Sequence, residues 1–109
     1  MNVIFLPKVL EYLDELVFIL FEKQYFSFLD TSIRYVDDLV DEIKDTLPMQ
    51  AYKPAPPFFN KYGEGMFYVV FKKNKRTSWY VVFRIYEENG ERIYQVRYIA
   101  NNHTVAQHL

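Results

Sequence analysis

The sequence predicts an α+β domain of order β-α-α-β-β-β, with two helices packed on one face of a mainly antiparallel four-stranded sheet. Two segments repeat apolar residues at spacings of three and four, which is typical of amphipathic helices. Three later segments are rich in β-branched and aromatic residues and are joined by short turns, which favours an antiparallel meander. The 109 residues, half of them hydrophobic, suit a single domain spanning residues 1–109.

The first strand and the first helix are expected near the N-terminus. Residues 2–6 (NVIFL) form a short apolar run that suits a buried strand. Pro7 stands where a helix can begin, because the first turn does not need its missing N–H. Over about residues 8–22 the apolar side chains follow helical spacing: Leu10, Leu13, Leu16, Val17, Leu20 and Phe21. We therefore expect this helix to bury one face.

The second helix is expected between the capping residues DTS at 30–32 and Pro48, which stops it. Its apolar stripe has spacings of three and four: Ile33, Val36, Val40, Ile43 and Leu47. Both stripes indicate core packing, and neither suggests a cofactor site. Residues 49–65 form a long loop, rich in proline and glycine, in which Phe58 and Phe59 are expected to pack down.

Three strands are expected at residues 66–73, 78–86 and 91–100. Asn89-Gly90 between the last two is the strongest hairpin signal, because a type I′ turn needs positive φ at both central residues. The side chains of a strand alternate between its two faces. Simple alternation places Arg97 and its neighbour Tyr98 on opposite faces, and the register that would relate Arg84 to Arg97 stays open.

The charge is divided unevenly between the two halves of the chain. Residues 1–50 carry four Lys/Arg against ten Asp/Glu, a net charge of −6, whereas residues 51–109 carry nine against four, a net charge of +5. Such asymmetry favours a polyanionic or acidic partner for the second half. A solvated surface with an accidental bias explains it equally simply.

Several classes of protein are disfavoured. There is no cysteine, which excludes disulfides, thiolate metal sites and cysteine nucleophiles. The apolar residues near the N-terminus are interrupted by charges, and no basic leader precedes them. We therefore expect no signal peptide, no membrane span and a cytoplasmic location.

Taken together, the element order, the opening VIFLPKVLEYLDEL and the closing WYVVFRIYEENGERIYQVRYIANNH resemble the RelE/ParE superfamily of toxins from type II toxin–antitoxin systems. The resemblance covers nearly the whole chain. It implies growth inhibition, either by cleavage of mRNA on the ribosome (RelE-like) or by inhibition of DNA gyrase (ParE-like). It also implies a cognate antitoxin protein that neutralises the toxin.

Carried over by position, the resemblance assigns only part of the RelE-like site. Arg84 matches an arginine that related toxins place after an aromatic residue. Val69 and Phe71 stand where RelE-like members place lysine, and Tyr80 stands where they often place arginine. These departures favour the alternatives, a ParE-like gyrase inhibitor or an inactive protein-binding relative.

Metal-free RNA cleavage needs a base for the 2′-OH proton, an acid for the leaving oxygen and cations for the phosphorane. His103 is the candidate proton carrier, since histidine titrates near neutral pH, although an exposed terminal residue is the plainer interpretation. Arg84 and Arg97 are candidates for holding the phosphate. Tyr80 and Tyr98 are candidates for stacking a base, and Tyr98 also for relaying a proton.

Four basic residues crowd one expected hairpin: Lys72, Lys73, Lys75 and Arg76. They suit contacts with an RNA backbone, or equally a charged turn that keeps a sheet edge soluble. No metal site is expected, because His103 and His108 are five residues apart with no acidic residue nearby. No cofactor is expected either.

Three functions follow as hypotheses. The first is a ribosome-dependent, metal-independent mRNA endoribonuclease toxin that binds a cognate antitoxin. The second is a ParE-like gyrase inhibitor or an inactive relative that binds a protein partner. The third is an unrelated small binding module with an aromatic sheet. A homodimer or a toxin–antitoxin hetero-oligomer is the expected assembly.

Overall fold

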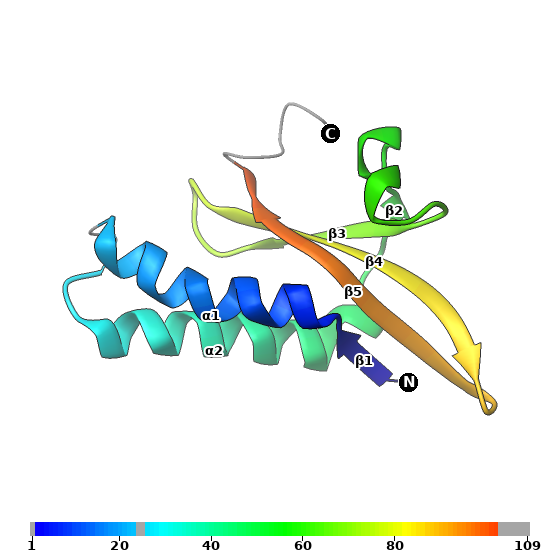
Figure 1. Cartoon of the computed structure of the whole chain (residues 1–109), viewed down its shortest axis with the longest axis horizontal. Helices are drawn as coiled ribbons and strands as arrows, with labels where there is room; N and C mark the ends of the chain where they lie inside the picture. Colours follow the sequence, from blue (N-terminus) through cyan, green and yellow to red (C-terminus); the bar gives the residue numbers. More distant parts are fainter. Residues whose placement is uncertain (1, 24–25, 103–109) are drawn as a thin grey trace.

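A computed structural model describes residues 2–23 and 26–102 of the chain (Figure 1). The elements within these residues, in chain order, are β1 (Asn2–Phe5), α1 (Pro7–Glu22), α2 (Leu29–Thr46), the 3₁₀-helix η1 (Leu47–Met49), β2 (Lys53–Pro54), the 3₁₀-helix η2 (Pro57–Tyr62), β3 (Phe67–Lys72), β4 (Ser78–Glu88) and β5 (Glu91–Asn101). The α+β class is confirmed, and so is the order of the long elements. None of the helices in the described residues is long and apolar enough to cross a membrane.

The sheet has the strand order β1-β5-β4-β3-β2 over the described residues. β1 runs parallel to β5, whereas the other neighbouring strands are antiparallel. The connection that follows β1 contains both α-helices, and a long helical connection of this kind allows parallel pairing. The fifth strand, β2, is a two-residue edge in the proline-rich loop, where a missing N–H is tolerated. The expectation of four strands is therefore wrong, because the described residues form a mixed sheet of five strands; three of its four neighbouring pairs are antiparallel, and the β1–β5 pair is parallel.

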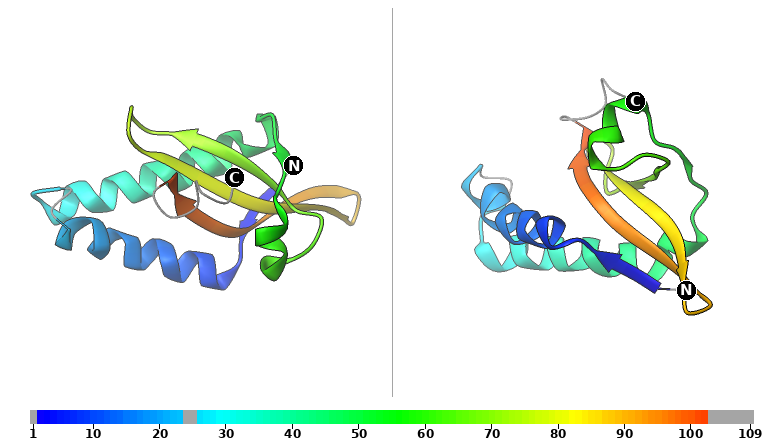
Figure 2. Two further views of the ribbon diagram at one scale, coloured as in Figure 1. Left: turned by 90° about the horizontal axis from the view of Figure 1, so that it is seen from above. Right: turned by 45° about the vertical axis from the view of Figure 1, so that its right-hand side comes forward.

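Both helices lie against one face of the sheet (Figures 1 and 2). α1 buries Val9, Leu13 and Leu16, whereas Leu10 is 48% exposed. The expected stripe is confirmed at Leu13 and Leu16, and Val17 and Leu20 pack against the core, whereas Val9 takes the buried place expected for Leu10. The second half of α1 is apolar on most sides (LVFILF), so spacing alone did not decide which side chains face the core.

The helices meet the sheet in one large core. It contains fifteen buried side chains: Val9, Leu13, Leu16, Val36, Leu39, Ile43, Leu47, Val69, Phe71, Trp79, Val81, Phe83, Tyr94, Val96 and Ile99. The indole N–H of Trp79 donates to the hydroxyl of Tyr35 on α2 (2.8 Å), so the buried polar atom is satisfied.

α2 begins differently from its predicted cap. It starts at Leu29 after an extended Phe28, and no side chain caps its N-terminus. Ser32, predicted as part of the cap, is fully buried instead, and its hydroxyl donates to the carbonyl of Val17 on α1. The serine therefore joins the two helices. Pro48 ends the α-helix as expected and lies in the 3₁₀ turn η1.

The outer face of the sheet, away from α1 and α2, carries a second and smaller core. Phe59 of η2 is fully buried there against Met66, Val82 and Ala100. The prediction that the loop packs down is confirmed for Phe59, whereas Phe58 is 38% exposed. η2 consequently covers part of a face that would otherwise be open.

A β-bulge changes the direction of side chains near the end of β5. The hairpin before it is as predicted, with positive φ at Asn89 (53°) and Gly90 (77°). Further along, Val82 pairs with Tyr98 but Phe83 pairs with Val96, so Arg97 is the extra residue. Tyr98 therefore shares the outer face with Val82, and simple alternation fails at this point.

Candidate functional site

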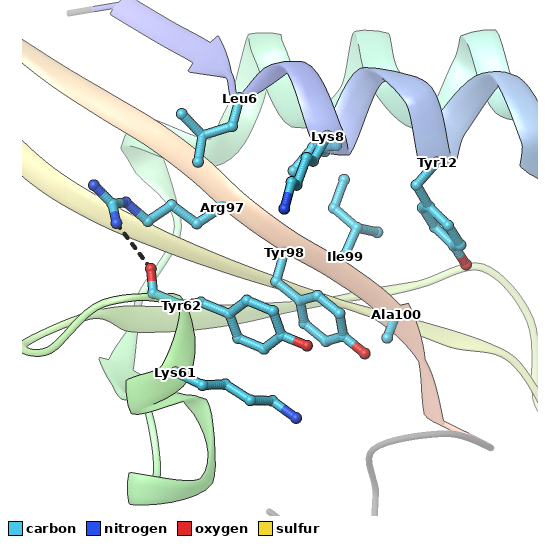
Figure 3. Close-up of a pocket in the computed structure, with 10 residues that line it drawn as sticks. Leu6, Lys8, Tyr12, Lys61, Tyr62, Arg97, Tyr98, Ile99 and Ala100 are labelled. Atoms are coloured by element: carbon cyan, nitrogen blue, oxygen red, sulfur yellow. Dashed lines mark hydrogen bonds between the residues drawn. The ribbon is translucent and has the colours of Figure 1, made fainter.

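A pocket of about 630 Å³ lies where the start of α1, the end of η2 and the last part of β5 meet (Figure 3). Its lining combines basic, aromatic and aliphatic side chains: Leu6, Lys8, Val9, Tyr12, Lys61, Tyr62, Arg97, Tyr98, Ile99 and Ala100. Three segments far apart in the sequence thus build one concave site, and its size suits a nucleotide or a short peptide segment.

The charge of the pocket is positive. Lys8 from α1, Lys61 from η2 and Arg97 from β5 line it, and no Asp or Glu does so among the described residues. Three cations with no lining carboxylate favour an anionic ligand, because each lowers the free energy of a nearby negative charge.

Arg97 is held by the backbone and by a neighbour on its own strand. Its Nε donates to Oε1 of Gln95 (2.9 Å), and its Nη1 donates to the carbonyl of Tyr62 (2.8 Å). Gly63 lets the guanidinium approach, because a Cβ added there would lie 2.8 Å from Nη1. A guanidinium has five N–H donors, so these two bonds fix its position and leave donors for a ligand.

Two tyrosines stack beside the arginine. The rings of Tyr62 and Tyr98 are 4.4 Å apart and nearly parallel, with an interplanar angle of 15°. Burial raises the pKa of Tyr98 to about 12, with a further contribution from the neighbouring Tyr62. Tyr98 therefore keeps its proton at neutral pH, and its predicted part in relaying a proton stays a prediction. Burial also raises the pKa of Tyr12, on the α1 side of the pocket.

Lys61 extends this basic and aromatic surface. Its Nζ lies 4.2 Å from the centre of the Phe58 ring and 5.3 Å from that of Tyr62. Such cation–π contacts keep the ammonium group beside the aromatic rings. Figure 3 shows Lys8 reaching from α1 toward the Tyr62–Tyr98 pair, so cations approach the rings from two sides.

The register between β4 and β5 relates Arg84 to Arg97. Arg84 pairs across the strands with Gln95, which in turn accepts the hydrogen bond from Arg97. The two therefore flank Gln95 on the outer face. Only Arg97 lines the pocket; Arg84 is exposed, with its guanidinium 5.9 Å from the ring of Tyr86.

Other predicted residues lie elsewhere. Tyr80 packs in the outer-face core, 6.3 Å from Tyr68 between ring centres, and does not line the pocket. His103 lies outside the described residues. Its proposed part in proton transfer stays a prediction.

One of the four basic side chains at the hairpin between β3 and β4 is held in an ion pair. Lys73 forms an ion pair with Glu42 of α2 (2.9 Å), which leaves Lys72, Lys75 and Arg76 exposed. The side chain of Asn102 ties the turn to the end of β5: it accepts from the Ser78 amide and donates to the carbonyl of Arg76.

Sequence reasoning missed the four other basic and tyrosine residues of the lining: Lys8, Tyr12, Lys61 and Tyr62. In the sequence Lys8 is simply one of the polar residues of the first helix. Tyr12 and Tyr62 are two of ten tyrosines in the chain. Nothing in their spacing distinguishes them, because the three segments meet only through tertiary packing.

Among residues 2–23 and 26–102, no cluster of three or more His, Cys, Asp or Glu side chains could hold a metal ion. Comparison of the chain with protein-family models, with curated proteins and with solved structures gives no match.

Proposed function

We propose that this protein is an RNA-cleaving toxin of the RelE/ParE type, and that the pocket around Arg97 and Tyr98 binds the RNA. The observation that carries the proposal is the composition of the pocket: among the described residues, its lining has three cations, three tyrosines and no carboxylate. Single-stranded RNA offers the matching groups, since its phosphates pair with cations and its unstacked bases lie on aromatic rings.

In this proposal Arg97 stabilises the transition state. The 2′-oxygen attacks the adjacent phosphorus, the bond to the 5′-oxygen breaks, and a 2′,3′-cyclic phosphate and a 5′-hydroxyl result. Negative charge grows on the phosphoryl oxygens, and a fixed guanidinium facing them contributes most when it need not reorganise. Its bonds to Gln95 and to the backbone of Tyr62 supply that rigidity.

The proton transfers divide between named groups. Tyr98 keeps its proton at neutral pH, because burial raises its pKa, and its hydroxyl donates a hydrogen bond to a phosphoryl or leaving oxygen. His103 follows the end of β5 by two residues and is the candidate for removing the 2′-OH proton. Lys8 and Lys61 bind phosphates flanking the cleaved bond.

The test is induction of the gene in a bacterial host, followed by mapping of mRNA 5′ ends and by cleavage assays on translating ribosomes. Growth arrest with new mRNA ends is expected. Lys8→Ala and Lys61→Ala change exposed side chains and should each lower cleavage about tenfold or more. The control is Lys44→Ala on α2, the same change outside the pocket, which should leave cleavage unchanged. Normal growth under strong induction without an antitoxin would contradict the proposal.

A second function, binding of a protein partner without chemistry, is favoured by apolar side chains around the connection between α1 and α2. Phe18 is 55% exposed and Phe28 71% exposed, and Phe21, Leu29 and Ile33 are each 37–40% exposed. Exposed apolar surface of this kind often marks protein contacts. It suits a cognate antitoxin or a ParE-like contact with DNA gyrase. A DNA gyrase supercoiling assay distinguishes RNA cleavage from gyrase inhibition. Loss of gyrase activity without mRNA cleavage would select the ParE-like function.

A further inference from the structure

Beyond the pocket, the outer face of the sheet carries a surface on β3 that the helices do not cover. β3 buries Val69 and Phe71 in the main core, whereas Val70 is 42% exposed and Lys72 is exposed on the opposite side of the strand. Tyr68 packs against the outer-face core, so the alternation is regular from Tyr68 to Lys72. The register between β3 and β4 runs without a shift, and cross-strand neighbours therefore share this face.

Two partly exposed tyrosines lie side by side on this surface. Tyr68 pairs with Val82 and Val70 pairs with Tyr80, so the two tyrosines are diagonal neighbours on adjacent strands. Their ring centres are 6.3 Å apart, with an interplanar angle of 41°. Figures 1 and 2 show η2 over another part of the sheet, while the hairpin between β3 and β4 extends away from it. Partly exposed rings on a sheet suit stacking with unpaired bases.

Exposed cations stand at both ends of the tyrosine pair. Lys53 of β2 pairs with Tyr68 and is exposed. Lys72 follows Tyr68 by four residues along β3, a distance of about 13 Å. Lys75 and Arg76 continue the row of exposed cations into the turn. A polyanion lying across the two rings therefore meets positive charge on either side.

The charges of the second half of the chain are separated along the sheet. Residues 51–82 have six basic residues against one acidic residue: Lys53, Lys61, Lys72, Lys73, Lys75 and Arg76 against Glu64. The other three glutamates, Glu87, Glu88 and Glu91, lie beside the turn between β4 and β5. The two turns stand at opposite ends of β4, so the tyrosine pair lies toward the basic end.

The basic turn is held in place before any ligand binds. The side-chain oxygen of Asn74 accepts from the amides of Arg76 (2.8 Å) and Thr77 (2.9 Å). The side chain of Asn102 bonds the same turn to the end of β5. A turn that is already ordered loses less conformational freedom on binding.

We propose that Tyr68 and Tyr80, with the four exposed cations Lys53, Lys72, Lys75 and Arg76, form a second binding surface for single-stranded RNA, separate from the pocket. This outer-face platform stacks unpaired bases on its rings and binds the flanking phosphates with its cations. A duplex keeps its bases stacked on one another, so it offers the platform only phosphates. The choice of RNA rests on the proposed function, whereas binding of a single strand does not require cleavage.

The first test measures binding of a fluorescein-labelled oligouridylate of about twelve nucleotides to the full chain by fluorescence anisotropy. Tyr68→Leu and Tyr80→Leu should each weaken binding at least about fivefold, because each removes one stacked base but keeps an apolar side chain on the outer-face core. Tyr86→Leu, the same change toward the acidic end of β4, is the control and should leave Kd unchanged. The same strand annealed to oligoadenylate should bind at least tenfold more weakly.

The second test uses salt dependence, which separates the cations from the rings. Lys53→Ala and Lys72→Ala change exposed side chains, and each should reduce the slope of log K against log salt concentration by about 0.7. The tyrosine variants should keep the slope of the unaltered chain, and so should Lys44→Ala on α2. Unchanged affinity of both tyrosine variants, an unchanged slope for both lysine variants, or equal binding of the duplex overturns the inference.

The inference and the proposed function fail separately, because the pocket variants Lys8→Ala and Lys61→Ala leave the platform intact. If they lower mRNA cleavage while both tyrosine variants bind RNA normally, the inference is overturned and the proposed function stands. If the tyrosine variants lose RNA affinity and induction cleaves no mRNA, the inference stands without the proposed function.

Discussion

Replacing Gly63 with alanine should disturb the fold and the pocket together. Gly63 has φ 134° and ψ 146°, a conformation that glycine adopts almost alone. An added Cβ would also lie 2.8 Å from Nη1 of Arg97, the atom that donates to the carbonyl of Tyr62. The substitution therefore strains the backbone and displaces the guanidinium at once. Gly65 is the matched control, because its φ is also positive (68°) but nothing lies within 4 Å of an added Cβ.

The expected magnitudes follow from these two differences. At Gly65 a left-handed alanine costs about 1–2 kcal/mol. At Gly63 the backbone costs about 1–3 kcal/mol, and loss of the charged hydrogen bond from Arg97 adds about 1.5–3 kcal/mol. Gly63→Ala should thus lower the free energy of unfolding about 2 kcal/mol more than Gly65→Ala. A domain of this length has a total of about 5–15 kcal/mol, so both variants should fold.

Urea denaturation monitored by tryptophan fluorescence measures the difference. With an m value of about 1.5 kcal/mol/M, the midpoint of Gly63→Ala should lie about 1–1.5 M below that of Gly65→Ala. RNA affinity should fall only for Gly63→Ala. Equal midpoints for the two variants would refute the reasoning that Gly63 is required for the approach of Arg97.

Three further predictions concern other contacts. Tyr35→Phe removes the acceptor of the buried indole N–H and should lower stability by about 1–3 kcal/mol, measured by thermal unfolding, whereas an unchanged transition would show that the hydrogen bond contributes nothing. In folded protein the 295 nm absorbance of Tyr98, isolated as the difference from Tyr98→Phe, should titrate near pH 12. Because the folded pKa is raised, the unfolded chain loses this proton first, so the contribution to stability is complete below about pH 10 and falls as the pH rises toward 12. Lys75→Ala should weaken RNA binding more than Lys73→Ala, since Lys73 is already paired with a glutamate; the reverse order in a filter-binding assay would exclude the hairpin tip as an RNA contact.

Much of the fold was predictable because its signals are local. Helical spacing located α1 and α2, and Asn89-Gly90 located the last hairpin, since the turn conformation depends on those two residues alone. The edge strand β2 was missed because two residues in a proline-rich loop carry no pattern. The prediction that Ser32 helps to cap α2 was wrong for a different reason. Serine is a good capping residue, but here its hydroxyl donates to the carbonyl of Val17 on α1.

Only some of the predicted site residues line the pocket. Arg97 and Tyr98 lie in the pocket, whereas Arg84 lies on the outer face beside it and Tyr80 packs in the outer-face core. Side-chain type made these residues candidates. Which of them meet was decided by one extra residue in β5, which turns Tyr98 to the outer face.

The sequence by itself determined the α+β class, the two helices, the hairpin and the separation of acidic and basic halves, because each depends on neighbours along the chain. Only the tertiary structure decided the parallel pairing of β1, the bulge at Arg97 and the meeting of Lys8, Lys61 and Arg97 around one pocket. Those three cations come from α1, η2 and β5, and packing between distant segments leaves no periodic trace in any one of them.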